Sequence, residues 1–199
     1  MSFQQFSFPQ VVKTLGLTPT DSDLFTPIPP LDLPLEFQAR VVEGANLASA
    51  INTEKARSEF VVAPILLEFR RLHAGRIGLF SGVELEADPS RGLNGVCDFL
   101  ITKSPLQHIV SLPIVTVVEA KNENLRTGMG QCIATMVAAQ LLNQAEPGGA
   151  TSIHGAVSSG NLWKFLRLAG TVVTIDLVEY LVDNVGKILG ILHHIVETA

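Results

Sequence analysis

The stretch LPIVTVVEAKNENLRTGMGQ, residues 112–131, constrains the fold most, because it sets charges at the end of a buried strand. Residues 114–118 are apolar or β-branched without a break, which is typical of a strand covered on both faces. Glu119 and Lys121 follow at once. Side chains alternate along a strand, so both share one face with Val117. The pattern therefore predicts a carboxylate and an ammonium on a face that is otherwise dry.

A second acid stands one predicted strand earlier. In LNGVCDFLIT, Asp98 alternates in phase with Leu100 on an otherwise apolar face. Two carboxylates on neighbouring strands repel and raise each other's pKa unless a divalent cation lies between them. Oxygen-only ligands suit Mg²⁺ or Mn²⁺. We therefore predict that Asp98 and Glu119 hold such an ion, with Lys121 beside it to orient or activate a water.

The remaining pattern divides into helices and strands. Thr53 is a suitable N-cap for a helix that runs to about Leu72, and Pro64 should kink or divide that helix. PGG at 147–149 should end the helix that follows the strand of Glu119. The predicted helices are 35–51, 53–72, 126–144 and 182–198, and the predicted strands are 77–86, 93–102, 113–120, 153–158, 162–168 and 172–180.

This order of elements predicts an α/β fold with a mixed central sheet flanked by helices. The first ~35 residues are rich in Pro, Thr, Ser and Asp, which indicates a loop or a wrapped extension. We therefore divide the chain into an N-terminal extension, 1–52, made of loop plus helix, and a domain, 53–199.

Composition narrows the class of protein. With 47% hydrophobic and 17% charged residues, the 199-residue chain is globular and can bury a substantial core. Its net charge of −5 argues against a general nucleic-acid coat, although metal-binding acids also add negative charge. No apolar run is long enough to span a bilayer, and the start lacks the features of a secretory signal. We expect a cytoplasmic protein that makes no membrane contact.

The motif formed by Asp98 and then Glu119-Ala120-Lys121 resembles that of the PD-(D/E)XK nuclease superfamily, the restriction-endonuclease-like fold. Its signature is an Asp on one strand, followed on the next by Glu or Asp, any residue, and Lys. The predicted order also matches its αβββαβ core over roughly residues 53–198. The run SSGNLWKFLRL is similar to a strand pair in relatives of the type I restriction enzyme nuclease domain. Cys97 stands where the name-giving Pro would be, a frequent departure in this superfamily.

The resemblance implies a metal-dependent endonuclease that hydrolyses phosphodiester bonds in DNA. Asp98 and Glu119 would hold Mg²⁺ or Mn²⁺, helped by the backbone carbonyl of Ala120, and Lys121 would position the attacking water. Many members carry a Glu on the first helix, and Glu59 fits that place. It would point toward Asp98 and would ligate a second metal or orient a metal-bound water. Gln131 fits a Gln that many members carry early in the helix after the Glu-x-Lys strand.

Glu59 also fits by helical spacing, since it shares a stripe with Val62 and Leu66. The alternative for Glu59 is a surface acid paired with Lys55. The histidines are isolated, apart from His193-His194, whose side chains would point to different sides of a helix. The sequence therefore predicts no histidine metal site.

Two other readings of the chain remain open. Glu119 and Lys121 could form an edge-strand salt bridge in a plain α/β interaction module. Alternatively, the domain could be an inactive restriction-endonuclease-like module that binds nucleic acid or a partner protein. A homodimer is also compatible with the sequence.

Overall fold

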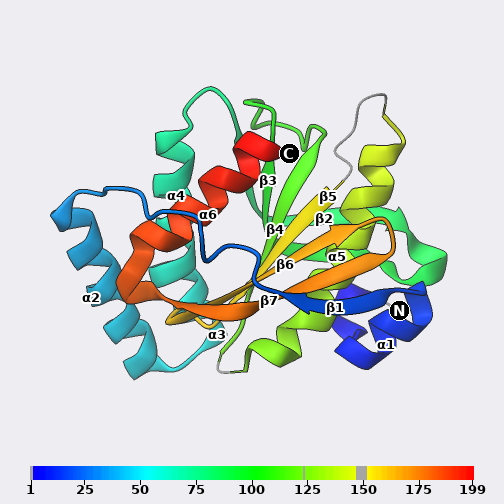
Figure 1. The fold of residues 1–199 in the computed structure, drawn as a ribbon, viewed down its shortest axis with the longest axis horizontal. Coiled ribbons are helices and arrows are strands. Elements are labelled where there is room, and N and C mark those ends of the chain that lie inside the picture. The colour runs from blue at the N-terminus through cyan, green and yellow to red at the C-terminus, as the bar shows by residue number, and fades with distance from the viewer. Residues whose placement is uncertain (1, 123, 147–151) are drawn as a thin grey trace.

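The computed structural model describes residues 2–122, 124–146 and 152–199. Its centre is a mixed seven-stranded sheet in the order β1-β7-β6-β5-β4-β3-β2. Helices cover both faces (Figure 1), so the predicted α/β class is confirmed. The strands are β1 (Thr18–Ser22), β2 (Gly78–Asp88), β3 (Leu93–Thr102), β4 (Ile114–Ala120), β5 (Ser152–Ser158), β6 (Leu162–Ala169) and β7 (Val172–Leu181). The α-helices are α1 (Phe8–Leu15), α2 (Leu35–Ile51), α3 (Glu54–Arg57), α4 (Ala63–Leu72), α5 (Leu125–Gln144) and α6 (Val185–Thr198).

The sheet is a meander followed by a crossover. Strands β2, β3 and β4 pair antiparallel, and β5 lies parallel to β4. A parallel neighbour requires a crossover connection, and α5 lies in it. Strands β6 and β7 continue antiparallel, and β1 adds a parallel edge beside β7. The PGG segment predicted to end α5 lies outside the described residues.

Two hydrophobic cores lie on the two sides of the sheet. One is formed with α2, α4 and α6 and includes Phe69 and Trp163. The other is formed with α5 and the N-terminal helices and includes Val117 and Ile133. Every residue of β4 is buried. This confirms that its unbroken apolar run belongs to a strand covered on both faces.

The helix predicted over 53–72 begins at its expected cap and is divided before Pro64. The Thr53 hydroxyl accepts a hydrogen bond from the Ala56 N–H at 3.1 Å. A π turn, Ser58–Val62, separates α3 from α4, and the Ala63 N–H bonds to the Ser58 carbonyl five residues back. The π turn places one extra residue in the helix, with consequences for the site described below.

The first 52 residues contain more regular structure than a loop and one helix. They also hold a short 3₁₀ helix, Phe3–Gln5, together with α1 and β1. All residues of β1 are exposed, and the sequence TPTDS has no apolar alternation. Its strand conformation comes from pairing with β7, beginning at Thr18 and Val172. Tertiary pairing therefore decides a segment whose own residues favour a loop.

Polar contacts fasten the segment between β1 and α2 to the domain. The buried carboxylate of Asp176 accepts hydrogen bonds from the Leu24 N–H at 3.2 Å and the Tyr180 hydroxyl at 2.8 Å. The Lys187 ammonium on α6 donates to the Phe25 carbonyl at 2.6 Å and also to the Ile28 carbonyl. These bonds hold the segment across α6 as part of the fold.

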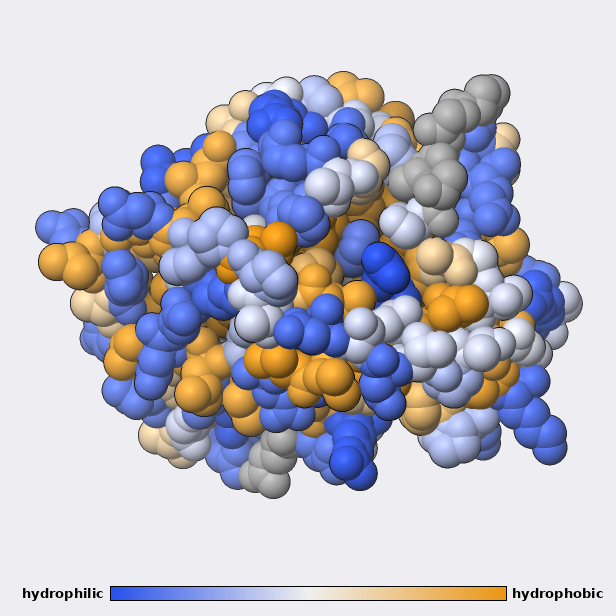
Figure 2. Space-filling view, viewed as in Figure 1, coloured by the Kyte–Doolittle hydropathy of each residue, from blue (hydrophilic) through white to orange (hydrophobic). Residues whose placement is uncertain are grey.

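The surface contains both hydrophobic and hydrophilic residues. On the face shown in Figure 2, hydrophobic and hydrophilic residues alternate in small patches. In the part of the chain that the structure describes, no helix has both the length and the apolar character needed to cross a bilayer.

Candidate metal centre

The two strand acids meet at one end of the β3–β4 pair. Phe99 pairs with Val118, so Asp98 and Glu119 are the next residues along the two strands. Glu119 projects toward α5, on the face that includes Val117, whereas the Asp98 carboxylate reaches across to the backbone at the end of β4. The Asp98 carboxyl lies close enough to raise the pKa of Glu119. The structure thus brings together the two acids that the alternation places on one face.

Asp98 also completes the backbone pairing of β4. Its Oδ2 accepts a hydrogen bond from the Ala120 N–H at 2.8 Å. The following N–H, of Lys121, points the other way and bonds to the Ser158 carbonyl at 2.7 Å. In an extended strand the N–H and C=O of one residue point to the same side. The Ala120 carbonyl is therefore directed toward the side of Asp98.

Glu119 is fully buried beneath α5. Its Oε2 accepts a hydrogen bond from the Gln131 Nε2 at 2.6 Å, and the Thr135 hydroxyl lies 3.5 Å from Oε1. Burial raises the pKa of Glu119 well above its usual range, and the Asp98 charge raises it further, while Lys121 opposes both effects. Two crowded carboxylates of this kind gain most from a cation placed between them.

Lys121 lies between the end of β4 and the start of α3. Its Nζ is 3.3 Å from the Glu54 Oε1, and only 14% of its side chain is exposed. Gly128, in the first turn of α5, leaves room for the aliphatic stem, because a Cβ atom there would lie 2.8 Å from the Lys121 Cγ. A Cβ atom there would also lie 2.6 Å from the Val157 Cγ1, so a larger residue at position 128 would displace both the lysine stem and Val157.

Glu59 lies outside this cluster, and the expectation that it faces Asp98 is wrong. Its carboxylate pairs with the Lys55 ammonium at 2.8 Å, and 52% of its side chain is exposed. The reason is the π turn. Its extra residue rotates the part of the helix that precedes Val62, so the buried face there no longer includes position 59. Arg57 is buried there in place of Glu59, and Glu54, at the start of α3, contacts Lys121.

Arg57 fixes α3 against the sheet. Its Nε donates to the Asn122 Oδ1 at 3.0 Å, and its Nη1 donates to the Ser159 carbonyl at 2.7 Å. These bonds join the helix to the residue after Lys121 and to the turn between β5 and β6. Glu54 is therefore held beside the site by a buried anchor three residues away.

Neither Glu54 nor Thr135 is predicted from the spacing of residues in the sequence. The position of Glu54 is indicated by the sequence, because an acid directly after an N-cap lies in the first helical turn. Its position does not depend on the helical periodicity after the π turn. Thr135 lies one turn after Gln131 and also donates to the Gln131 carbonyl at 3.0 Å. Its part in the site follows from i, i+4 spacing once Gln131 is placed.

A groove opens on the same face of the sheet. It has a volume of about 1060 Å³ and lies between residues 4–10, the first turn of α5 and the strands β6 and β7, with Arg126 and Lys164 in its lining. Glu119 pairs with Val157, and Val157 with Lys164, so the lysine is in the same row across the sheet as the acid. The cations Arg126 and Lys164 are balanced in the lining by the acids Asp21 and Glu179, and the Glu179 Oε1 lies 3.9 Å from the Lys164 Nζ.

Comparison with models of protein families and with curated proteins finds no match for the chain.

Proposed function

We propose that this protein is a metal-dependent phosphodiesterase of the restriction-endonuclease-like class, acting on DNA. The observation that carries the proposal is the meeting of Asp98, Glu119 and Lys121 at the end of β4. The donor set fits Mg²⁺ or Mn²⁺, because it offers two carboxylates and the Ala120 carbonyl directed to the same side. The bound ion would act as a Lewis acid toward the phosphate.

The protein's own groups would do the rest of the work. An ammonium has only N–H donors, so Lys121 would donate to the attacking water or to a phosphate oxygen. Glu54 would hold that ammonium in place through the 3.3 Å contact. Gln131 and Thr135 would orient Glu119 from α5. Each role keeps a charged group fixed before the substrate arrives.

The order of elements supports the same class. An α3–α4 helix precedes the β2–β3–β4 meander, α5 crosses over, and β5 lies parallel to β4. This is the αβββαβ order that the resemblance implies. Asp98 on β3 and Glu119 near the end of β4 support the proposal, because the resemblance implies acids on these two strands.

A second candidate is an inactive module that binds nucleic acid or a partner protein. It is favoured by the full burial of Glu119 and by the contact between Lys121 and Glu54, which neutralises the ammonium. In this reading the trio is a structural cluster. The two candidates differ in whether the protein cuts.

The test is cleavage of supercoiled plasmid and of single-stranded DNA by the full chain with Mg²⁺ or Mn²⁺. We expect nicking that stops with a chelator. We also expect none with the Asp98→Asn, Glu119→Gln double variant, purified in the same way. A wild-type protein that cuts neither DNA form with either metal would favour the inactive module. Equal cutting by the double variant would place the activity elsewhere.

Glu54 and Glu59 form a matched pair on one helix, one facing Lys121 and one facing solvent. Glu54→Gln is expected to lower the cleavage rate by about tenfold, because the positioned ammonium loses a charged partner. Glu59→Gln is expected to leave the rate within about twofold, since an exposed i, i+4 pair contributes little. Initial rates at saturating Mg²⁺ compare the two, and the reverse order of effects would restore Glu59 to the site.

A further inference from the structure

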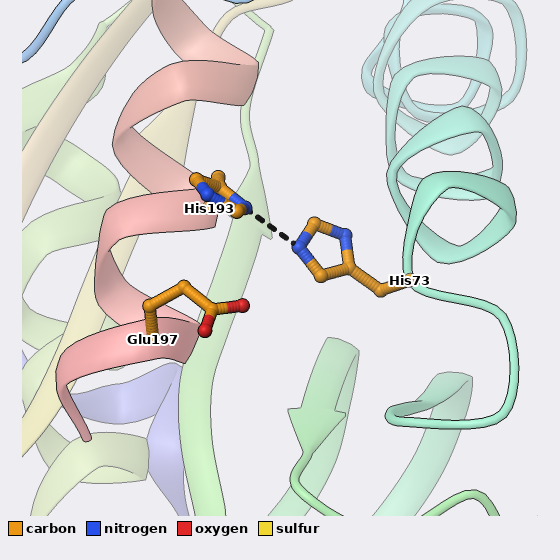
Figure 3. A group of neighbouring side chains, drawn as sticks. All are labelled: His73, His193 and Glu197. Atoms are coloured by element: carbon orange, nitrogen blue, oxygen red, sulfur yellow. Dashed lines mark hydrogen bonds between the residues drawn. The ribbon is translucent and has the colours of Figure 1, made fainter.

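A second group of potential metal ligands lies where the end of α4 meets α6 (Figure 3). His73 is at the C-terminal cap of α4, and His193 and Glu197 lie one turn apart on α6. One ligand atom from each of the three side chains lies within 4.8 Å of the others. Both helices pack on the face of the sheet opposite α5, so this group is separate from the acids of the first centre.

The hydrogen bonds of His73 fix which ring nitrogen is free to bind an ion. The His73 Nδ1 is 3.0 Å from the Phe69 carbonyl, and a carbonyl can only accept, so Nδ1 carries the proton. The Nε2 then presents its lone pair to the His193 Nδ1, 2.9 Å away. A histidine that ligates a metal commonly donates its other N–H to a backbone carbonyl in this way. The ring is thus already oriented for binding.

The separations suit a tetrahedral ion. Two nitrogens at Zn–N distances of about 2.0–2.1 Å lie roughly 3.3 Å apart, so the 2.9 Å pair needs to open by only about 0.4 Å. His73 is buried, whereas His193 is half-buried and is the ring with more room to shift.

Glu197 is the third potential ligand. Its Oε1 contacts the Arg76 Nη2 at 2.7 Å, and its side chain is 38% exposed. A carboxylate has two oxygens, so Arg76 can keep one while the other binds an ion. The exposed side of Glu197 also gives an ion a route from solvent.

We propose that His73, His193 and Glu197 form a Zn²⁺ site that joins α4 to α6. Two imidazoles and one carboxylate suit Zn²⁺ and do not suit Mg²⁺, which prefers oxygen ligands only. The ion would take the position of the proton shared between the two rings. His193 would then carry its proton on Nε2 instead of Nδ1, so each imidazole keeps one N–H and stays neutral.

The test is titration of the full chain with Zn²⁺ by calorimetry and with Co²⁺ by visible absorption. The Asp98→Asn, Glu119→Gln background removes the acids of the first centre as ligands. We expect one Zn²⁺ per chain, a higher Tm with Zn²⁺, and a Co²⁺ spectrum typical of tetrahedral coordination. Failure of DNA cleavage would leave these results unaffected, because the two sites share no residue.

Substitution of each ligand identifies the site. His193→Asn is expected to lower the Zn²⁺ affinity at least about a hundredfold, more than loss of a residue that only supports a ligand. Glu197→Gln is expected to lower it at least about tenfold, and it changes only a partly exposed group. His108→Asn, at an exposed histidine outside the group, should not change the affinity. The proposal would be overturned if the Asp98→Asn, Glu119→Gln background bound no Zn²⁺. It would also be overturned if His193→Asn and Glu197→Gln bound Zn²⁺ with the same affinity as that background.

Discussion

Lys121→Ala is expected to lower the rate of DNA cleavage by about a hundredfold or more while leaving the affinity for Mg²⁺ nearly unchanged. An ammonium cannot ligate a cation, so its contribution lies in placing a charge and a hydrogen bond at the water or the phosphate. Loss of a positioned group of this kind typically costs between a hundredfold and ten-thousandfold. Single-turnover cleavage and Mg²⁺ calorimetry on the same preparation separate the two effects.

Two control variants test the explanation for Lys121. Lys121→Arg should rescue little, because the planar guanidinium is larger and the stem is confined beside Gly128. Lys55→Ala removes an ammonium on α3 whose side chain is 81% exposed. This variant should leave the cleavage rate within about twofold of wild type. Equal cleavage by wild type and Lys121→Ala would remove Lys121 from the reaction.

The double substitution Asp98→Asn, Glu119→Gln is expected to abolish Mg²⁺ binding and to stabilise the protein without metal. The amides keep the shape of the site and can still accept from the Ala120 N–H and the Gln131 Nε2. They remove two crowded acids, one of them fully buried, whose ionised forms cost folding free energy when no cation lies between them. We expect a gain of about 1–2 kcal/mol, or a rise in Tm of roughly 2–8 °C.

The measurement is thermal unfolding of both proteins with and without Mg²⁺. Wild type should gain stability as Mg²⁺ is added, because the ion binds only the folded state, and the variant should not respond. A variant that still binds Mg²⁺ with wild-type affinity would show that these acids are not the ligands. A lower Tm of the metal-free variant would show that the charges stabilise the fold.

Strand β4 and the acids beside it can be predicted from the sequence because each depends on local alternation. A strand covered on both faces is an unbroken apolar run, and a charge at its end keeps the phase of the strand. The same alternation places Asp98 on the face of Glu119. The boundaries of α2 and β3 are also predicted correctly, at 35–51 and 93–102, since their patterns are bounded by turn residues.

The parts that cannot be predicted depend on contacts distant in sequence. The strand β1 exists through its pairing with β7, and no residue of TPTDS indicates it. The group of His73 and His193 joins residues 120 positions apart, so spacing along the chain carries no sign of it. Glu59 is misplaced for a different reason, because helical periodicity assumes a constant number of residues in each turn.

The number of residues in the π turn sets how α3 is rotated about the helix axis relative to α4. An α-helix turns by about 100° per residue, so removal of one residue from 58–62 would rotate α3 by that angle relative to α4. Glu54 would then turn away from Lys121, and Arg57 would lose its alignment with Asn122 and Ser159. A single-codon deletion on this helix would therefore separate the lysine from its acidic partner while leaving every side chain of β3 and β4 unchanged.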